Sequence, residues 1–194
     1  MRLTPQLQQR LDLLQMTSIE LNAFIKLQIL DNPVLEKITL QEVHNINEAA
    51  FEESAITPDV CIEEANSDYI IYFPNDSSSS LRISDSYIKL VLGSAATNSE
   101  MRESIKRDVR LAVDLLRNVE HRRQSIHRVV EYIVRNQHEF LVRGVDFIKA
   151  DSLEGAASAT GMSISLISYV INRKHVDTRH GLIELRLFFK EEKC

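Results

Sequence analysis

The chain has 194 residues, of which 44% are hydrophobic and 26% charged, and it contains no Trp. This composition is typical of a globular protein and excludes a disordered chain. Two cysteines, Cys61 and Cys194, make neither a disulfide framework nor a tetrahedral metal site by themselves; we expect the first in the core and the second in an exposed tail. No charged leader precedes an apolar run, and no stretch is long enough to span a bilayer. The sequence therefore predicts a cytoplasmic protein without a membrane partner.

The net charge of −5 is unevenly distributed along the chain. Up to Met101, 6 Lys and Arg stand against 15 Asp and Glu, whereas residues 102–149 carry 11 against 7. An acidic front and a basic middle indicate separate surfaces with separate partners. The alternative is that the basic residues form a solvated helix face. Taken as a whole, the net charge gives no support for nucleic-acid binding.

Residues 1–36 are predicted to form a helical hairpin. Thr4 suits the N-cap of the first helix, and Pro5 its first position. Thr17 and Glu20 form a capping box for the second helix, and Asn32-Pro33 ends it. The inner faces are predicted to be Leu7, Leu11 and Leu14 in the first helix and Leu21, Phe24, Ile25 and Gln28 in the second. Such short helices are marginal in water, so the pair must dock on the rest of the chain or on a partner.

Residues 37–55 are acidic and weakly patterned, and are interpreted as a linker, with a short helix near Glu48 as one option. The β-branched and aromatic runs Val60–Ile62 and Tyr69–Phe73 flank turn formers and predict a small β-hairpin. The run Ser77–Ser80 indicates a flexible loop before a short segment at Leu81–Ile83.

Beyond Asn98 the pattern is strongly helical. One predicted helix has the apolar stripe Met101, Ile105, Val109, Ala112 and Leu116, with a basic face of Arg102, Lys106 and Arg110. A further helix is predicted to bury Ile126, Val129, Val130, Ile133, Phe140 and Leu141, and to end at Gly144 in a left-handed cap. The basic face is a candidate contact surface, and a solvated surface is its plain alternative.

Residues 151–174 have the rhythm of a helix-turn-helix. Asp151 and Glu154 open the unit, Ala157 lies four residues before Gly161, and Ser163 caps the second helix. Ile167 and Val170 are predicted to face inward. A generic two-helix corner can also show Ala and Gly at these positions. The predicted fold is mainly α: a helical hairpin, a helical region with a small β-hairpin, and a helix-turn-helix.

Three blocks of the sequence can be read together. The first is LTPQLQQRLDLLQ followed by SIELNAFIKLQILDNPVLE; the second is ITPDVCIEEANSDYIIYF with LRISDSYIKLV; the third is QSIHRVVEYIVRNQHEFLVRG with the helix-turn-helix and HGLIELRLFF. They resemble the sigma-54 factors, the enhancer-dependent specificity subunits of bacterial RNA polymerase, and follow that family's order. The resemblance assigns 1–36 to the activator-interacting region, 56–149 to a remnant of the core-polymerase-binding domain, 150–190 to a DNA-binding helix-turn-helix segment and 191–194 to a tail.

The chain also departs from the family pattern. About twenty residues replace a whole helical subdomain of the core-binding part, and the C-terminal domain with the family's signature box is missing. Where the family usually has Glu, Thr and Arg in the recognition helix, this chain has Ile164, Leu166 and Tyr169. Base-edge readout needs polar groups that reach the groove, so the remaining side chains are expected to position DNA rather than to specify its sequence.

The resemblance implies three sets of site residues. The DNA-binding set is Ser163, Ser165, Leu166, Ser168, Tyr169, Arg173, Lys174, Arg179 and His180; the activator and promoter-gating set is Leu7, Leu11, Leu14, Leu21 and Ile25; the core-polymerase set is Arg102, Lys106 and Arg110. Each of the leucines also fits a plain core stripe.

The implied function is that of a shortened transcription initiation factor whose partners are core RNA polymerase, promoter DNA and an ATP-dependent enhancer-binding activator. The alternative is a degenerate polymerase-interaction module without promoter-specific binding. An enzyme is not expected, because no Gly-rich phosphate loop, nucleophile context or histidine ligand spacing occurs. No cofactor or metal is expected, since in this family the activator hydrolyses the ATP.

Overall fold

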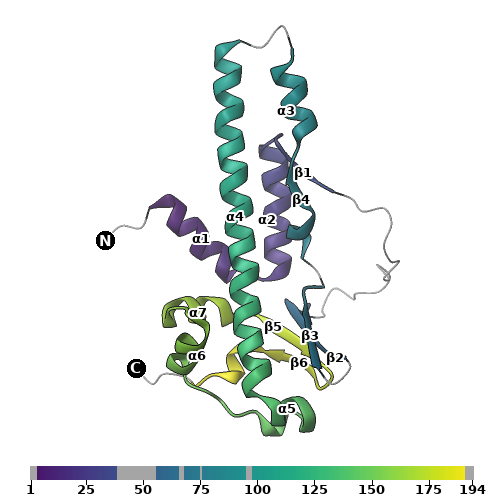
Figure 1. The fold of residues 1–194 in the computed structure, drawn as a ribbon, viewed down its shortest axis with the longest axis vertical. Helices are drawn as coiled ribbons and strands as arrows, with labels where there is room; N and C mark the ends of the chain where they lie inside the picture. Colours follow the sequence, from purple (N-terminus) through teal and green to yellow (C-terminus); the bar gives the residue numbers. More distant parts are fainter. Residues whose placement is uncertain (1–3, 39–55, 66–67, 75, 95–97, 191–194) are drawn as a thin grey trace. The chain divides into compact units, whose positions relative to one another are not determined.

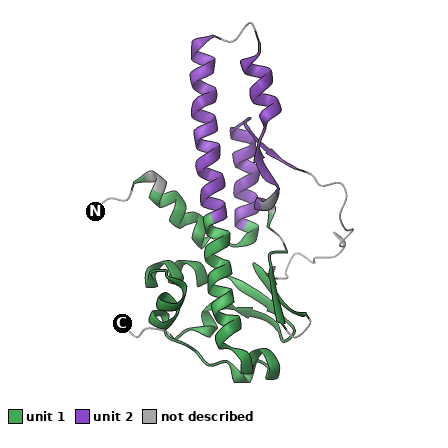
Figure 2. Cartoon of the chain, viewed as in Figure 1, with its two compact units in different colours: residues 1–19, 57–76, 121–194 green, residues 20–56, 77–120 purple. Residues whose placement is uncertain are grey.

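A computed structural model describes residues 4–38, 56–65, 68–74, 76–94 and 98–190 (Figure 1). The chain divides into two compact units (Figure 2): unit 1 comprises residues 1–19, 57–76 and 121–194, and unit 2 comprises residues 20–56 and 77–120. Most described residues are helical, which confirms the predicted fold class. None of the described helices combines the length and the apolar character that a membrane-spanning segment requires. Most of the linker, including Glu48, and the tail with Cys194 lie outside the described residues.

The two N-terminal helices begin and end where the sequence predicts. Helix α1 spans Pro5–Gln15, and the Thr4 side chain accepts a hydrogen bond from the Leu7 N–H at 3.3 Å. Helix α2 spans Ser18–Asp31 and ends before Asn32. The predicted inner face of α1 is partly wrong, because Leu7 is 40% exposed while Leu13, which was not predicted, is buried beside Leu14. Only the second half of α1 is therefore packed.

Unit 2 contains a two-stranded sheet and parts of three helices. Strand β1 (Leu35–Lys37) pairs antiparallel with β4 (Leu81–Ile83), and α3 spans Asp85–Leu92. The sequence prediction contained neither β1 nor α3. Residues Ser77–Ser80 form a 3-10 turn, so the prediction of a flexible loop was wrong there. The Asn32 side chain donates a hydrogen bond to the Asp108 carbonyl at 2.8 Å and fixes the end of α2.

Helix α4 is continuous over Ser99–Asn136, where the sequence predicted two helices. Buried Leu115, Val119 and Ile126 carry the apolar stripe through the intervening residues without a helix breaker. A separate short helix, α5, spans His138–Arg143 and ends at Gly144. Gly144 has a φ of 106° and a ψ of −174°, a glycine conformation but not the predicted left-handed helical one.

Unit 1 is built on a four-stranded sheet of order β3-β2-β5-β6. Strands β2 (Val60–Ala65) and β3 (Asp68–Tyr72) form the predicted hairpin. Strands β5 (His175–Thr178) and β6 (Gly181–Glu184) were not predicted, and β5 pairs parallel with β2. A parallel pair between strands so far apart in the chain leaves no local sequence signal.

The core of unit 1 lies between this sheet and the second part of α4. Val60, Ile62 and Val176 from the sheet pack with the six apolar residues predicted to be buried in α4 and α5, which confirms that prediction. Helices α6 and α7 and the 3-10 turn Leu185–Phe188 complete the core. Cys61 is buried, as expected.

The helix-turn-helix forms with short-range caps. Helix α6 spans Leu153–Thr160 and α7 spans Ile164–Ile171; Gly161 between them is in the left-handed helical conformation, with φ 69° and ψ 21°. Ser163 caps α7 as predicted, by accepting from the Leu166 N–H at 3.2 Å. The N-cap of α6 is Ser152, and the fully buried small residue is Ala156, whereas the predicted Ala157 is only half-buried. Ile167 and Val170 are buried as predicted.

The buried position of Ala156 generates a stability prediction. Ala156→Leu adds a branched side chain where no solvent-accessible surface remains, so we expect it to lower the free energy of unfolding by about 1–3 kcal/mol. Urea unfolding followed by circular dichroism measures the change. Ala159→Leu, on the exposed side of the same helix, is the matched control and should change stability by less than about 0.5 kcal/mol. Equal midpoints for the two variants would show that the helix crossing is not tightly packed.

Candidate nucleic-acid interface

Helix α7 and its N-cap expose three serine hydroxyl groups to solvent, and we refer to these three residues together as the serine row. Ser163, Ser165 and Ser168 are exposed, whereas Leu166 and Tyr169 are half-buried and pack against the core of unit 1. Serine hydroxyls can bind phosphate oxygens, which fixes the position of a duplex without reading its sequence. The arrangement therefore favours backbone contacts over base-edge contacts.

Arg173 extends this surface beyond the end of α7. It is exposed and has a φ of 58°, the left-handed conformation that non-glycine residues adopt uncommonly. The turn at Arg173 ends the helix and leads the chain into β5. The exposed cation follows α7 closely in the chain, and its contact with a phosphate stays a prediction.

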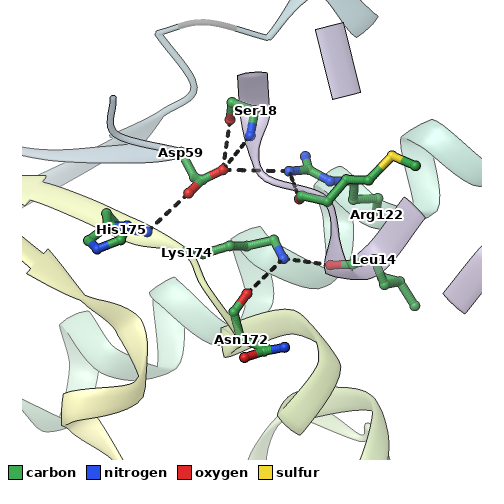
Figure 3. Close-up of polar contacts among 8 residues, drawn as sticks. Leu14, Ser18, Asp59, Arg122, Asn172, Lys174 and His175 are labelled. Atoms are coloured by element: carbon green, nitrogen blue, oxygen red, sulfur yellow. Dashed lines mark hydrogen bonds and ion pairs between the residues drawn. The ribbon is translucent and has the colours of Figure 1, made fainter. Parts of the chain in front are cut away.

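Lys174 was predicted to contact DNA, and the structure contradicts this. Its side chain is fully buried, and its Nζ donates hydrogen bonds to the carbonyl oxygens of Leu14 at 2.6 Å and Asn172 at 3.5 Å (Figure 3). A buried ammonium group needs such acceptors to offset its lost hydration. Lys174 holds the end of α1 and is not available to a phosphate.

A buried carboxylate, that of Asp59, is the centre of the neighbouring polar cluster (Figure 3). Its Oδ1 accepts from the backbone N–H of Ser18 at 2.6 Å and from the Ser18 hydroxyl at 3.0 Å, and its Oδ2 accepts from the His175 N–H at 3.0 Å. The guanidinium of buried Arg122 lies 3.7 Å from Oδ1 and donates to the Met16 carbonyl at 2.9 Å. Four distant segments of the chain thus meet at one charge.

The cluster explains how the N-terminal segment is docked. Residues 14 and 16 offer carbonyl groups at the end of α1, where helix carbonyls lack partners within the helix. Lys174 and Arg122 donate to those carbonyls, and cations are favoured at helix C-termini. The docking site that the hairpin was predicted to need therefore lies partly within this chain. Neither Arg122 nor Asp59 was predicted as a site residue. Arg122 nevertheless occupies a position between Val119 and Ile126 where the pattern of α4 calls for an apolar side chain.

The structure does not place Arg179 and His180 beside α7, although all three were predicted to form one DNA-binding surface. Both lie in the turn between β5 and β6, where Arg179 pairs with Glu64 at 2.6 Å and donates to the Val142 carbonyl at 2.7 Å. The His180 ring lies 2.9 Å from the Leu141 carbonyl oxygen. Within unit 1, α6 and α7 lie on one side of α4, and this hairpin lies on the other (Figure 1). The two side chains are engaged by α5 and β2, away from the serine row.

The predicted gating residues differ in exposure. Leu7 is exposed and Leu11 is half-buried, whereas Leu14, Leu21 and Ile25 are buried. Of these five predicted residues, only Leu7 and, in part, Leu11 offer apolar surface to a partner.

The predicted polymerase-contact residues, Arg102, Lys106 and Arg110, are all exposed on α4. Lys106 pairs with Glu103 at 2.8 Å, and this hydrogen bond and charge lower the pKa of the Glu103 carboxyl. The basic face is therefore partly neutralised by its own helix.

Cationic side chains of α1 and α4 lie close together in unit 1. Burial, followed by the charges of Arg10 and Arg128, lowers the pKa of the His121 imidazole. Arg10 of α1 and Arg128 of α4 therefore both act electrostatically on the same imidazole. No group of three or more His, Cys, Asp or Glu residues in the described ranges is arranged to hold a metal ion.

Two family models match the chain. Residues 1–37 match the sigma-54 factor activator interacting domain, and residues 102–193 match the sigma-54 DNA binding domain.

Curated relatives of the chain belong to the family that these two models describe. The chain is 32% identical over 136 residues to the RNA polymerase sigma-54 factor of Rhizobium etli, covering 70% of this chain and 25% of the relative. It is 27% identical over 134 residues to the putative RNA polymerase sigma-54 factor of Clostridium kluyveri, covering 69% and 29%. The chain thus spans less than a third of the length of the curated relatives it matches.

A solved structure shares the fold. The crystal structure of Aquifex aeolicus sigmaN bound to promoter DNA superposes with a TM-score of 0.51 and 28% identity, covering 75% of this chain and 43% of that one. The likeness covers much of the described chain but under half of the solved one.

The cluster at Asp59 generates a stability prediction. Asp59→Ala leaves buried Arg122 without its carboxylate, so we expect unfolding to become easier by about 3–5 kcal/mol. Asp59→Asn keeps an acceptor oxygen and should lose less. Hydrogen exchange of the amides of unit 1 measures both changes.

Asp177→Ala provides the control, because Asp177 is exposed on β5 next to the same cluster. Its exchange rates should match those of the wild type. A similar loss in Asp59→Ala and Asp177→Ala would contradict the role assigned to the buried charge.

Proposed function

The chain belongs to the sigma-54 family, and from this we propose that it acts as a sigma-54-like transcription initiation factor that binds core RNA polymerase and promoter DNA under the control of an ATP-dependent activator. The observation that carries the proposal is the docking of α1 on the same unit as the helix-turn-helix, through Lys174 and Arg122. This docking supports the proposal, because it joins the residues that match the activator interacting domain to those that match the DNA binding domain. The chain would work in the cytoplasm as a regulatory protein rather than as an enzyme.

DNA binding is proposed to rest on phosphate contacts. The serine row of α7 and Arg173 would hold the backbone, and the cations of α1 and α4 would add attraction without sequence preference. Ile164, Leu166 and Tyr169 give α7 few groups that could read base edges. Promoter selectivity would therefore be weak unless polymerase contributes to it.

Control by the activator is proposed to act through α1. Lys174 follows α7 closely in the chain and holds the end of α1. Displacement of α1 would leave a buried ammonium group without its nearest acceptor, so the chain around the end of α7 must rearrange. A partner that binds exposed Leu7 could in this way change the helix-turn-helix.

The remaining segments receive proposed roles from the family's order. Residues 56–149 would supply the contact with core polymerase, including exposed Arg102, Lys106 and Arg110. Residues 37–55 would act as a linker between this part and the activator-interacting residues 1–36, and residues 150–190 would form the DNA-binding segment.

The deciding experiment measures binding of the full chain to purified core RNA polymerase, with and without a promoter fragment that carries the family's paired elements. Retention of the promoter fragment over a scrambled duplex is the expected result. Ile164→Glu, Leu166→Thr and Tyr169→Arg together restore the family's usual side chains and should increase that preference. Binding of core without any promoter preference would indicate a polymerase-interaction module, and binding of neither would refute the proposal.

A second measurement distinguishes the proposed phosphate contact of Arg173 from the structural role of Lys174. Arg173→Ala should weaken binding to any duplex and reduce the slope of log affinity against log salt by about 1, since one phosphate contact is lost. Lys174→Met should leave that slope unchanged, because the side chain is buried. Fluorescence anisotropy with a labelled duplex at several salt concentrations gives both slopes. A reduced slope for Lys174→Met would show that this side chain reaches DNA after all.

A further inference from the structure

The sheet of unit 1 buries one face against α4 and turns the other outward. The strand register places Cys61 of β2 opposite Tyr72 of β3 and Asp177 of β5, and Asp177 opposite Leu182 of β6. These side chains form one row across all four strands. Glu63 lies two residues along β2 from Cys61, on the same face. We call this side of the sheet the outer face.

The outer face exposes three large apolar side chains, on β3 and β6. Ile70, Tyr72 and Leu182 are 52%, 37% and 38% exposed. Beside β6, a hollow of about 520 Å³ adds the exposed side chains of Val145 and Leu187. Single exposed apolar residues need no explanation, but a group of them on one surface is typical of a protein interaction site.

A second hollow opens where β2 and β5 separate. Their parallel pairing covers only two positions, at Val60 and Cys61 of β2, and beyond them lies a space of about 460 Å³. Carboxylates line this space: Glu63, Glu64 and Asp177. Arg179 neutralises Glu64. In the described part of the chain, Glu63 and Asp177 form no ion pair, so the hollow is left with negative charge.

The chemistry of the outer face selects a cationic partner. Asp146 and Glu184 line the hollow beside β6, so both hollows carry carboxylates. The Tyr72 hydroxyl donates to Glu63 at 2.5 Å, which fixes the ring at the edge of the hollow between β2 and β5. An aromatic ring beside carboxylates suits a Lys or Arg side chain. A phosphate backbone would be repelled.

We propose that the outer face is a docking surface for a basic segment of a partner protein, in which Lys or Arg residues alternate with apolar ones. The apolar side chains of such a segment would cover Ile70, Tyr72 and Leu182, and its cations would meet Glu63 and Asp177. This goes beyond the proposed DNA binding, because the sheet lies on the other side of α4 from α7 (Figure 1). Unit 1 would then carry a DNA-facing side and a protein-facing side of opposite charge.

The test is an NMR titration of the full chain with a ten-residue peptide of alternating Lys and Val. We expect amide shifts concentrated in β2, β3, β5 and β6, and binding that weakens between about 0.15 and 0.5 M salt. A matched peptide of alternating Glu and Val, and a fifteen-base-pair duplex, should leave these strands unperturbed. Shifts at other elements, equal shifts with the Glu peptide or the duplex, or no shifts at all would overturn the proposal.

Two outer-face variants and one matched control make the test specific. Glu63→Lys with Asp177→Lys should weaken binding of the Lys peptide at least tenfold, whereas Glu154→Lys with Glu100→Lys makes the same change in net charge at exposed positions elsewhere and should not. Leu182→Ser keeps every charge and should also weaken binding. If neither outer-face variant weakens peptide binding, that binding is adventitious and the proposed docking surface is refuted. The DNA-binding measurements are independent of this outcome.

Discussion

A single buried carboxylate organises the unit that contains the helix-turn-helix. Asp59 connects the start of β2 to the start of β5, because its side chain and its backbone N–H both form hydrogen bonds with the backbone of His175. The same carboxylate accepts from Ser18 at the start of α2 and lies beside Arg122 of α4. A charge withdrawn from water must be matched by partners in nearly fixed positions. The pairing of β2 with β5, the position of α4 and the turn before α2 therefore all depend on the place of the Asp59 carboxylate. The buried ammonium group of Lys174 imposes a second requirement of this kind nearby.

The parts of the fold that the sequence predicts are those with local causes. Thr4, Ser163 and Gly161 act on residues within one helical turn, so their effect can be read from spacing alone. The antiparallel pair of β5 and β6 is local and was missed all the same. Strand β1 escaped prediction because its partner β4 lies far away in the chain, and the pairing of β5 with β2 is equally distant. Lys174 was misread as a surface cation for a related reason. Its main partner is a main-chain carbonyl 160 positions away, and no side-chain pattern reveals a carbonyl.

The amino-acid composition of α7 follows from its packing. Its apolar side chains either enter the core or pack against it, and hydroxyls occupy the exposed positions. A helix of this kind can hold a duplex but offers little to distinguish one base pair from another. The acidic outer face across α4 has the opposite preference. Charge alone would thus keep a nucleic acid and a basic protein segment on different sides of unit 1.

The contact between Leu14 and Lys174 also has a consequence for how the protein is made. Residue 14 leaves the ribosome long before residue 174, and at about 5–20 residues per second the interval is on the order of ten seconds or more. During that time α1 is too short to be stable alone, and the core that receives Leu14 is incomplete, because α7 and β5 follow late in the chain. The beginning of the chain must therefore wait for its end, and a nascent chain interrupted before β5 would expose an unsatisfied apolar segment to chaperones and proteases.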